Sequence, residues 1–199
     1  MKRPPEGVLA SLNCDGKRGL ALLSVLAIPW LLLAGGPPWV AALRYERQGL
    51  ASGEWWRLIS AHWVHLNARH LWLDSAGLVL LWSLYARALR AWQWLLVLAG
   101  GSAAIDAGLW WWQPQLQWYV GLSGILHGVW AAGAVAEGRR QGGWAWLMLL
   151  VLAVKLFLEQ HSGGSLLVGD FPVVTVAHLY GALGGLGAYA ALALWRKPL

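Results

Sequence analysis

The sequence contains a single cysteine, Cys14, and few charged side chains for its length. One cysteine excludes an intrachain disulfide and a metal centre built from several thiolates, and leaves open an intermolecular disulfide or an attached lipid. Charged residues make up 12% of the 199 residues, against about a quarter in an ordinary soluble domain. No stretch is polar enough for a separate soluble domain, so we expect one compact domain within lipid.

Hydrophobic residues are abundant, at 58% of the chain. Apolar runs that approach the about 20 residues of a membrane-spanning helix recur from end to end. The expected helices are residues 19–36, 66–86, 92–112, 122–137, 144–158 and 175–195. The sequence therefore predicts an all-α membrane protein with a six-helix bundle over residues 19–197, after a cytoplasmic N-terminal segment of residues 1–18. The first run also fits a signal peptide, but a retained helix completes the bundle.

Two connections are long. Residues 37–61 contain Pro37-Pro38 and a short amphipathic stretch, which is typical of a segment that lies in the membrane interface. Residues 160–174 are rich in glycine and precede the last helix. Many of the 17 tryptophans flank the apolar runs, where their rings favour the membrane–water boundary.

The net charge of +6 does not form one basic patch of the kind that binds nucleic acid. With six spans, ten of the fifteen basic residues fall on one face of the membrane: Lys2, Arg3, Lys17, Arg18, Arg87, Arg90, Arg139, Arg140, Arg196 and Lys197. Because basic loops remain in the cytoplasm, both termini are predicted to be cytoplasmic.

The first candidate catalytic motif is Gly121-Leu122-Ser123-Gly124, at the start of the fourth expected helix. A serine at this position often only caps the helix. Glycines on both sides allow a second backbone to come close. The unpaired N–H groups of a helix start also favour negative charge, which suits an oxyanion.

The sixth expected helix carries a matching glycine face. His178, Gly181 and Gly185 are spaced i, i+3 and i+7 and therefore share one side of it. The fourth helix offers the small pair Gly124 and Gly128, and such pairs let membrane helices pack closely.

Contact between these faces predicts that Ser123 and His178 meet near the outer side of the membrane. A hydrogen bond of about 3 Å between them is what a nucleophile and its base require. A histidine that only joins two helices is the alternative. His127, one turn after Ser123, is a second candidate base or a structural hydrogen-bonding residue.

A third group comprises His62, His65, His70 and Asp74. His70 and Asp74 are i, i+4 neighbours on the second expected helix. Metal binding by these four residues remains open, although no familiar ligand spacing is completed. We expect instead that His65 and His70 order the first loop or stabilise an oxyanion.

Together these motifs resemble the rhomboid family of intramembrane serine proteases, over residues 17–197. The matching pieces are Trp56-Arg57, His65 and His70, the Gly121–Gly124 motif, and Ala177-His178 with Gly181 and Gly185. The resemblance implies a Ser123–His178 dyad without an acid and no cofactor or metal. It also implies an oxyanion site at the Ser123 N–H, supported by His70, Asp74, Gly121 and Leu122. The family usually has asparagine at the position of Asp74, and an ionised aspartate there would repel an oxyanion.

The run Ser123-Gly124-Ile125-Leu126-His127-Gly128 looks like the rhombosortase subgroup. That resemblance implies a multi-pass protein of the bacterial inner membrane with its site toward the periplasm. The implied partners are transmembrane anchors of exported proteins that carry a C-terminal Gly-Gly motif. Two rivals remain: a non-catalytic rhomboid-like protein that binds membrane helices, and a small transporter or metal-binding protein that uses the histidine cluster.

Overall fold

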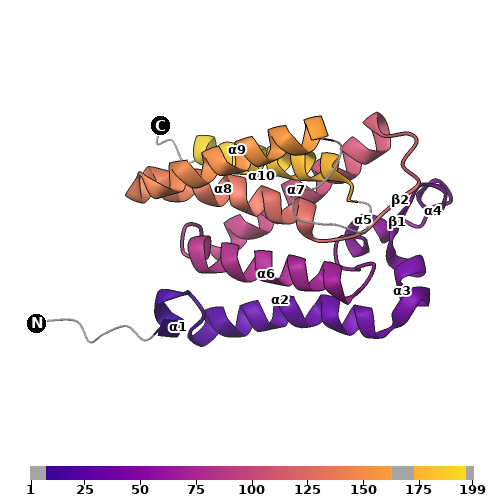
Figure 1. Cartoon of the computed structure of the whole chain (residues 1–199), viewed down its shortest axis with the longest axis horizontal. Helices are drawn as coiled ribbons and strands as arrows, with labels where there is room; N and C mark the ends of the chain where they lie inside the picture. The colour runs from indigo at the N-terminus through magenta and orange to yellow at the C-terminus, as the bar shows by residue number, and fades with distance from the viewer. Residues whose placement is uncertain (1–7, 163–172, 196–199) are drawn as a thin grey trace, which may run out of the picture.

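The computed structural model describes residues 8–162 and 173–195 and is mostly helical. Long helices lie side by side with their axes roughly aligned (Figure 1). They are α2 (Gly16–Ala34), α6 (Ala68–Tyr85), α7 (Ala91–Trp112), α8 (Ser123–Gln141), α9 (Trp144–Ser162) and α10 (Thr175–Trp195). The shorter elements are α1 (Val8–Ser11), α3 (Gly36–Leu43), β1 (Tyr45–Glu46), α4 (Arg47–Ala51), α5 (Arg57–Ser60) and β2 (Trp118–Tyr119).

Four helices among the described residues are long and apolar enough to cross a membrane, namely α2, α7, α9 and α10. Helices α6 and α8 have similar lengths but a more polar composition. Helix α6 carries His70 and Asp74, and α8 carries His127 and Glu137. The two more polar helices supply part of the candidate site described below, and α9 and α10 supply the rest.

Several expected boundaries need correction. The first helix covers residues 16–34 rather than 19–36, because Gly36 adopts a positive φ of 69° and a new helix begins there. The fourth continues past residue 137 to Gln141, before Gly142 at φ 71°. The fifth continues past residue 158 to Ser162, which brings Glu159 inside a helix. The all-α expectation also omitted the two short strands. Residues 1–7, 163–172 and 196–197 of the expected segments lie outside the described residues.

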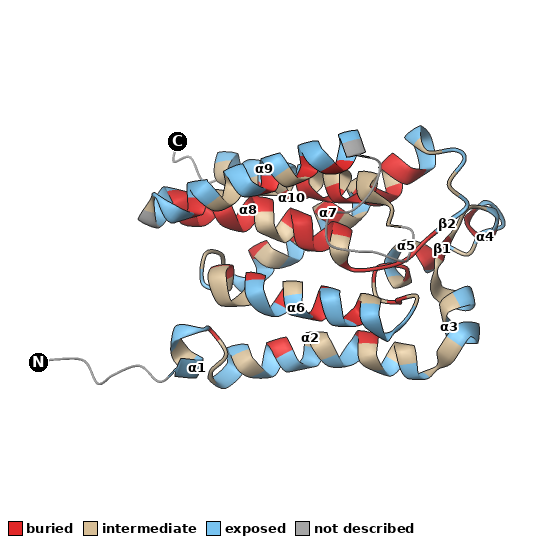
Figure 2. Ribbon diagram, in the orientation of Figure 1, coloured by how far each residue is buried: buried red, intermediate tan, exposed pale blue. Residues whose placement is uncertain are grey.

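Helix α8 is the most buried of the long helices, whereas α2 is largely exposed (Figure 2). The exposed positions of α2 and α9 are largely apolar, and they include Leu23, Leu31, Leu150 and Phe157. A soluble protein does not expose apolar surface of this extent. These side chains therefore fit contact with lipid.

Glycines bring α8 and α10 into backbone contact. A Cβ added to Gly181 would overlap the carbonyl oxygen of Gly124, and one added to Gly128 would lie 2.6 Å from the carbonyl oxygen of Gly181. A Cβ on Gly185 would lie 2.5 Å from the Cα of Gly128. Any larger residue at these positions would separate the two helices.

The segment between α2 and α6 is held by arginines. Arg57 is buried, and its guanidinium donates to the carbonyl oxygens of Ala41 at 2.8 Å and Arg44 at 2.9 Å. Arg47 donates to the carbonyl oxygens of Leu109 at 2.7 Å and Gln113 at 3.0 Å, at the end of α7. These bonds satisfy carbonyl groups that a helix end leaves unpaired.

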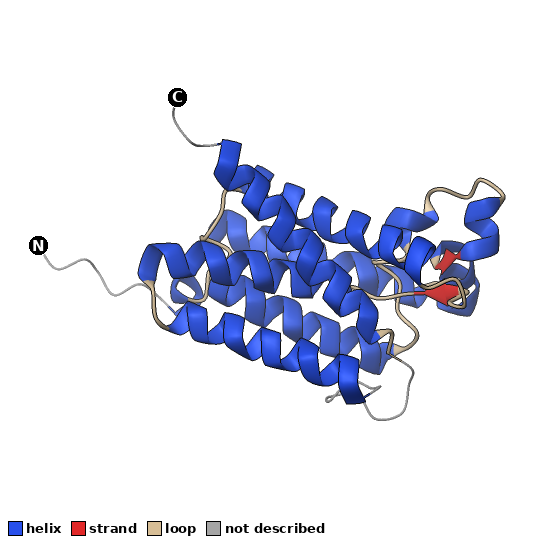
Figure 3. Ribbon diagram, turned by 90° about the horizontal axis from the view of Figure 1, so that it is seen from above, coloured by secondary structure: helices blue, strands red, loops and turns tan. Residues whose placement is uncertain are grey.

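The two strands connect this segment to the start of α8. They pair antiparallel, with Tyr45 opposite Tyr119, and lie at one end of the helices (Figure 3). Three residues separate Tyr119 from Ser123, and within them the Gly121 N–H donates to the Ala61 carbonyl oxygen at 3.0 Å. The first loop therefore fixes where α8 begins.

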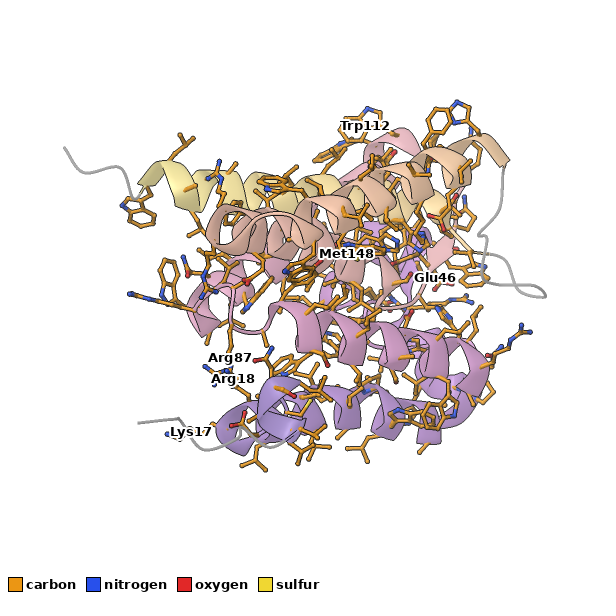
Figure 4. All side chains as sticks on the ribbon, turned by 60° about the vertical axis from the view of Figure 1, so that its left-hand side comes forward. Lys17, Arg18, Glu46, Arg87, Trp112 and Met148 are labelled. Atoms are coloured by element: carbon orange, nitrogen blue, oxygen red, sulfur yellow. The ribbon has the colours of Figure 1, made fainter. Side chains whose placement is uncertain are left out.

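Basic residues collect at the opposite end. Lys17, Arg18 and Arg87 lie together there, away from Glu46 and Trp112 (Figure 4). Arg139 and Arg140 occupy the last turn of α8, which ends on the same side. Of the ten basic residues expected on one face, Lys2, Arg3, Arg196 and Lys197 lie outside the described residues.

Candidate active site

Ser123 is the first residue of α8, and its side chain faces α10 rather than capping its own helix. The N-cap is Leu122, and no side-chain cap bond is formed there. Instead, Ser123 Oγ lies 3.0 Å from Nε2 of His178. The capping interpretation therefore does not describe this serine.

His178 sits in the first turn of α10 and is 3% exposed. Its second ring nitrogen, Nδ1, lies 2.8 Å from Oε2 of Glu159. An ionised carboxylate only accepts hydrogen bonds, so Nδ1 carries the proton and Nε2 is left as an acceptor for the Ser123 hydroxyl. This is the tautomer that a general base requires.

Glu159, on α9, was not among the sequence candidates. It is fully buried, and its other oxygen, Oε1, accepts from Lys155 Nζ at 2.6 Å. Two reasons explain the omission: the expected helix ended at residue 158, and the family resemblance implied a dyad without an acid. A usable signal was present, because Lys155 and Glu159 are charges four residues apart in an apolar helix, where charged groups are costly and need a partner.

His127 packs against the pair without replacing its base. Its Nδ1 lies 2.7 Å from the carbonyl oxygen of Ser123 and must donate to it. Its ring stacks on that of His178, with centroids 4.1 Å apart and an interplanar angle of 11°. This geometry supports a structural role that holds the His178 ring from one side.

Asp74 occupies the helix N-terminus beside Ser123. Its Oδ2 accepts from the N–H groups of Leu122 at 3.0 Å and Ser123 at 3.1 Å, and from His65 Nε2 at 3.0 Å. The carboxylate therefore faces the donors that an oxyanion would need. The Asp74 side chain therefore points into the site and not away from it.

His70 and Gly121 complete this corner. His70 Nε2 lies 3.6 Å from Asp74 Oδ2. Gly121 has a φ of 117°, and a Cβ there would come within 2.8 Å of His70 Nε2. Both the backbone conformation and the space require glycine at this position.

A cavity of about 310 Å³ opens beside Ser123. Its walls come from the residue before α6, the segment around β2 and the residues before α10: Leu66, His70, Gln115–Val120, Ser123, Val173 and Val174. The wall is mainly apolar, and Ser123 and His70 face it. A peptide segment in this cavity would have its carbonyl close to the nucleophile.

Two groups of side chains have donor atoms close enough to share a metal ion: His65 with His70 and Asp74, and His127 with Glu159 and His178. In the second group both His178 nitrogens are engaged, and Lys155 brings a positive charge to Glu159. A cation would have to displace these contacts. His62 belongs to neither group, because its Nε2 faces Asp106 Oδ1 at 3.4 Å.

Comparison with known proteins shows what the whole chain is similar to. The family model described as "Rhomboid domain" matches residues 52–196. The chain is 25% identical over 177 residues to the Bacillus subtilis (strain 168) protein named "Putative rhomboid protease YdcA", covering 82% of each chain.

Proposed function

Because this chain belongs to the rhomboid family, we propose that it is an intramembrane serine protease with Ser123 as nucleophile and His178 as general base. The observation that carries the proposal is the 3.0 Å contact between Ser123 Oγ and His178 Nε2. The tautomer imposed by Glu159 leaves Nε2 free to accept the serine proton. Nucleophile and base on two different helices, with the base oriented by a third group, form the arrangement of serine hydrolases.

The reaction begins when a substrate helix unwinds near its end, since only a carbonyl outside a helix can be attacked. His178 takes the Ser123 proton as Oγ bonds to the carbonyl carbon, and then protonates the leaving amine. Water, or an amine acceptor, resolves the acyl-enzyme. The Leu122 and Ser123 N–H groups and His70 hold the oxyanion, so Asp74 Oδ2 must release those donors. Each such donor contributes about 2.7–4 kcal/mol in other enzymes.

The rhombosortase-like run from Ser123 to Gly128 supports a narrower substrate class. We assign to it exported proteins with a C-terminal Gly-Gly motif, an apolar span and a basic tail. Glycine weakens a helix by about 1 kcal/mol relative to alanine, which favours unwinding at the Gly-Gly pair.

The same proposal assigns six membrane spans, with α6 and α8 crossing beside the four more apolar helices. The basic end that holds Lys17, Arg18 and Arg87 is the cytoplasmic end. The site then faces the periplasm of a bacterial inner membrane.

Ser123→Ala and His178→Ala each remove one reacting group. Both are expected to abolish release of a membrane-anchored reporter while enzyme abundance stays unchanged. Matched controls are Ser102→Ala, since the Ser102 hydroxyl donates to the Leu98 carbonyl, and His161→Ala on the exposed side of α9.

Reporters with Gly-Gly or Ala-Ala before the apolar span test the substrate class, and we expect faster cleavage of the Gly-Gly form.

A fluorophosphonate probe separates the enzyme from a non-catalytic helix-binding protein. The enzyme is labelled at Ser123, and the label is lost in both Ser123→Ala and His178→Ala. Reporter cleavage at the wild-type rate in both variants would eliminate the Ser–His mechanism. An unlabelled but folded wild-type protein would favour the helix-binding rival.

A further inference from the structure

Glu159 is a charged residue in an apolar helix, and the burial of its charge requires a physical explanation. It is fully buried on α9, and both of its oxygens are engaged, one by His178 and one by Lys155. A carboxylate removed from water costs several kcal/mol unless it is paired and hydrogen-bonded. Ionisable groups within a membrane protein usually serve function.

We propose that Glu159 is a positioning residue that converts the Ser123–His178 pair into a triad, and that Lys155 sets the charge of this carboxylate. The inference rests on the proposed protease function and deepens it. Glu159 touches neither substrate nor the attacked carbonyl, and it acts only through His178.

The orienting effect follows from the hydrogen bonds. With Glu159 ionised, Nδ1–H of His178 points to Oε2 and the Nε2 lone pair points to Ser123 Oγ. An uncharged amide in place of the carboxylate can donate to Nδ1, which moves the ring proton to Nε2. The imidazole then faces Ser123 with a proton already on Nε2 and cannot accept another.

The charge effect follows from the proton transfer. When Ser123 gives its proton to His178, the imidazolium forms 2.8 Å from the Glu159 carboxylate and is stabilised by it. Lys155 opposes this stabilisation because its ammonium group shares the same carboxylate. The other titratable groups around His178 are His127, stacked on its ring from α8, and the His70–Asp74 pair of α6 on the far side of Ser123.

A purely structural ion pair is the competing explanation. In that case Lys155 and Glu159 matter only to each other. Removal of either charge would leave the other unpaired and do equal harm, whereas removal of both would restore the protein. A positioning role predicts that loss of Glu159 lowers activity more than loss of Lys155. It also predicts that the double variant does not regain activity, because the carboxylate beside His178 is still missing.

The experiment uses the full chain in four forms: Glu159→Gln, Lys155→Met, the double variant, and Glu137→Gln as matched control. Glu137 is also a buried glutamate, but it pairs with Arg140 near the end of α8, away from Ser123. Each form is assayed for reporter cleavage across pH, for the rate of fluorophosphonate labelling at Ser123 and for thermal stability in detergent.

Glu159→Gln is expected to lower kcat on the order of 10²- to 10⁴-fold, the scale seen when the acid of a serine protease triad becomes an amide. The double variant stays equally slow but regains thermal stability. Lys155→Met loses less than Glu159→Gln, and Glu159→Asp recovers at least part of the rate. Glu137→Gln matches the wild type.

The pH profile provides a readout that a structural role would not move. The acid limb of kcat/KM is expected to shift to lower pH in the double variant and to higher pH in Lys155→Met, by about one unit each. Restored activity in the double variant, or coincident profiles in all forms, would overturn the role of Glu159. If Ser123→Ala also cleaves normally, the proposed function itself fails, which is a separate result.

Discussion

At the scale of single residues, Asp74 is the position that departs most from the family pattern. Its carboxylate accepts the two backbone N–H groups at the start of α8, the donors that the mechanism assigns to the oxyanion. Negative charge there competes with the transition state for the same hydrogen bonds. We therefore expect Asp74 to slow the reaction without preventing it.

Replacement of Asp74 by asparagine removes this charge and keeps the shape. We expect Asp74→Asn to raise kcat about tenfold, which corresponds to about 1.4 kcal/mol of the barrier. Steady-state cleavage of the reporter in detergent measures it. Asp106→Asn is the control, since Asp106 is buried on α7 beside His62, and it should leave kcat unchanged. A tenfold fall in Asp74→Asn would mean that the carboxyl group itself assists the reaction.

At the scale of elements, the contact between α8 and α10 determines whether the catalytic pair forms. Ser123 and His178 belong to different helices, and the glycines behind them allow the backbones to touch. The separation of the two helices is therefore coupled directly to the distance between Oγ and Nε2. Stability and activity should change together along this contact.

Gly181→Ala tests this coupling. The added methyl group would overlap the Gly124 carbonyl oxygen, and overpacking of this kind costs about 1–3 kcal/mol. We expect a lower melting temperature and slower fluorophosphonate labelling of Ser123. Gly187→Ala on the same helix is the control, because nothing lies within 4 Å of its added Cβ. A rise in melting temperature in both variants would mean that the gain in helix propensity outweighs the overlap, and the role of the helix contact would fail.

At the scale of the whole molecule, charge is divided between two ends. Lys17, Arg18 and Arg87 gather at one end (Figure 4), whereas Arg47 and Arg57 at the other donate to backbone carbonyls. The proposed orientation puts the end that holds Lys17, Arg18 and Arg87 in the cytoplasm, since basic residues near the ends of membrane helices tend to remain there.

Cysteine accessibility measures that orientation. In a Cys14→Ala background, Ser11→Cys is exposed at the basic end, and Gln115→Cys is exposed in the segment before β2. A membrane-impermeant maleimide applied to spheroplasts should label Gln115→Cys at once, and Ser11→Cys only after the membrane is permeabilised. The reverse pattern would invert the proposed orientation.

The sequence alone indicated a membrane protein, the approximate positions of the long helices and a contact between Ser123 and His178, which lie 3.0 Å apart in the structure. These follow from local signals: apolar run length, basic residues at helix ends, and glycine spacing along a single helix. The match to the Rhomboid domain over residues 52–196 agrees with the family that those signals indicated. The glycine faces indicated the Ser123–His178 contact, but no local signal indicated the partners of the buried carboxylates.

Only the tertiary structure decided the partners of the charged groups. It placed Glu159 on His178, turned Asp74 toward the N–H groups of Leu122 and Ser123, and separated His62 from His65 and His70. The contacts of Glu159 and of Asp74 each join two different helices, and both depend on how far those helices slide and rotate. Those two variables are set by packing across the whole bundle, so no pattern along one helix could have fixed them.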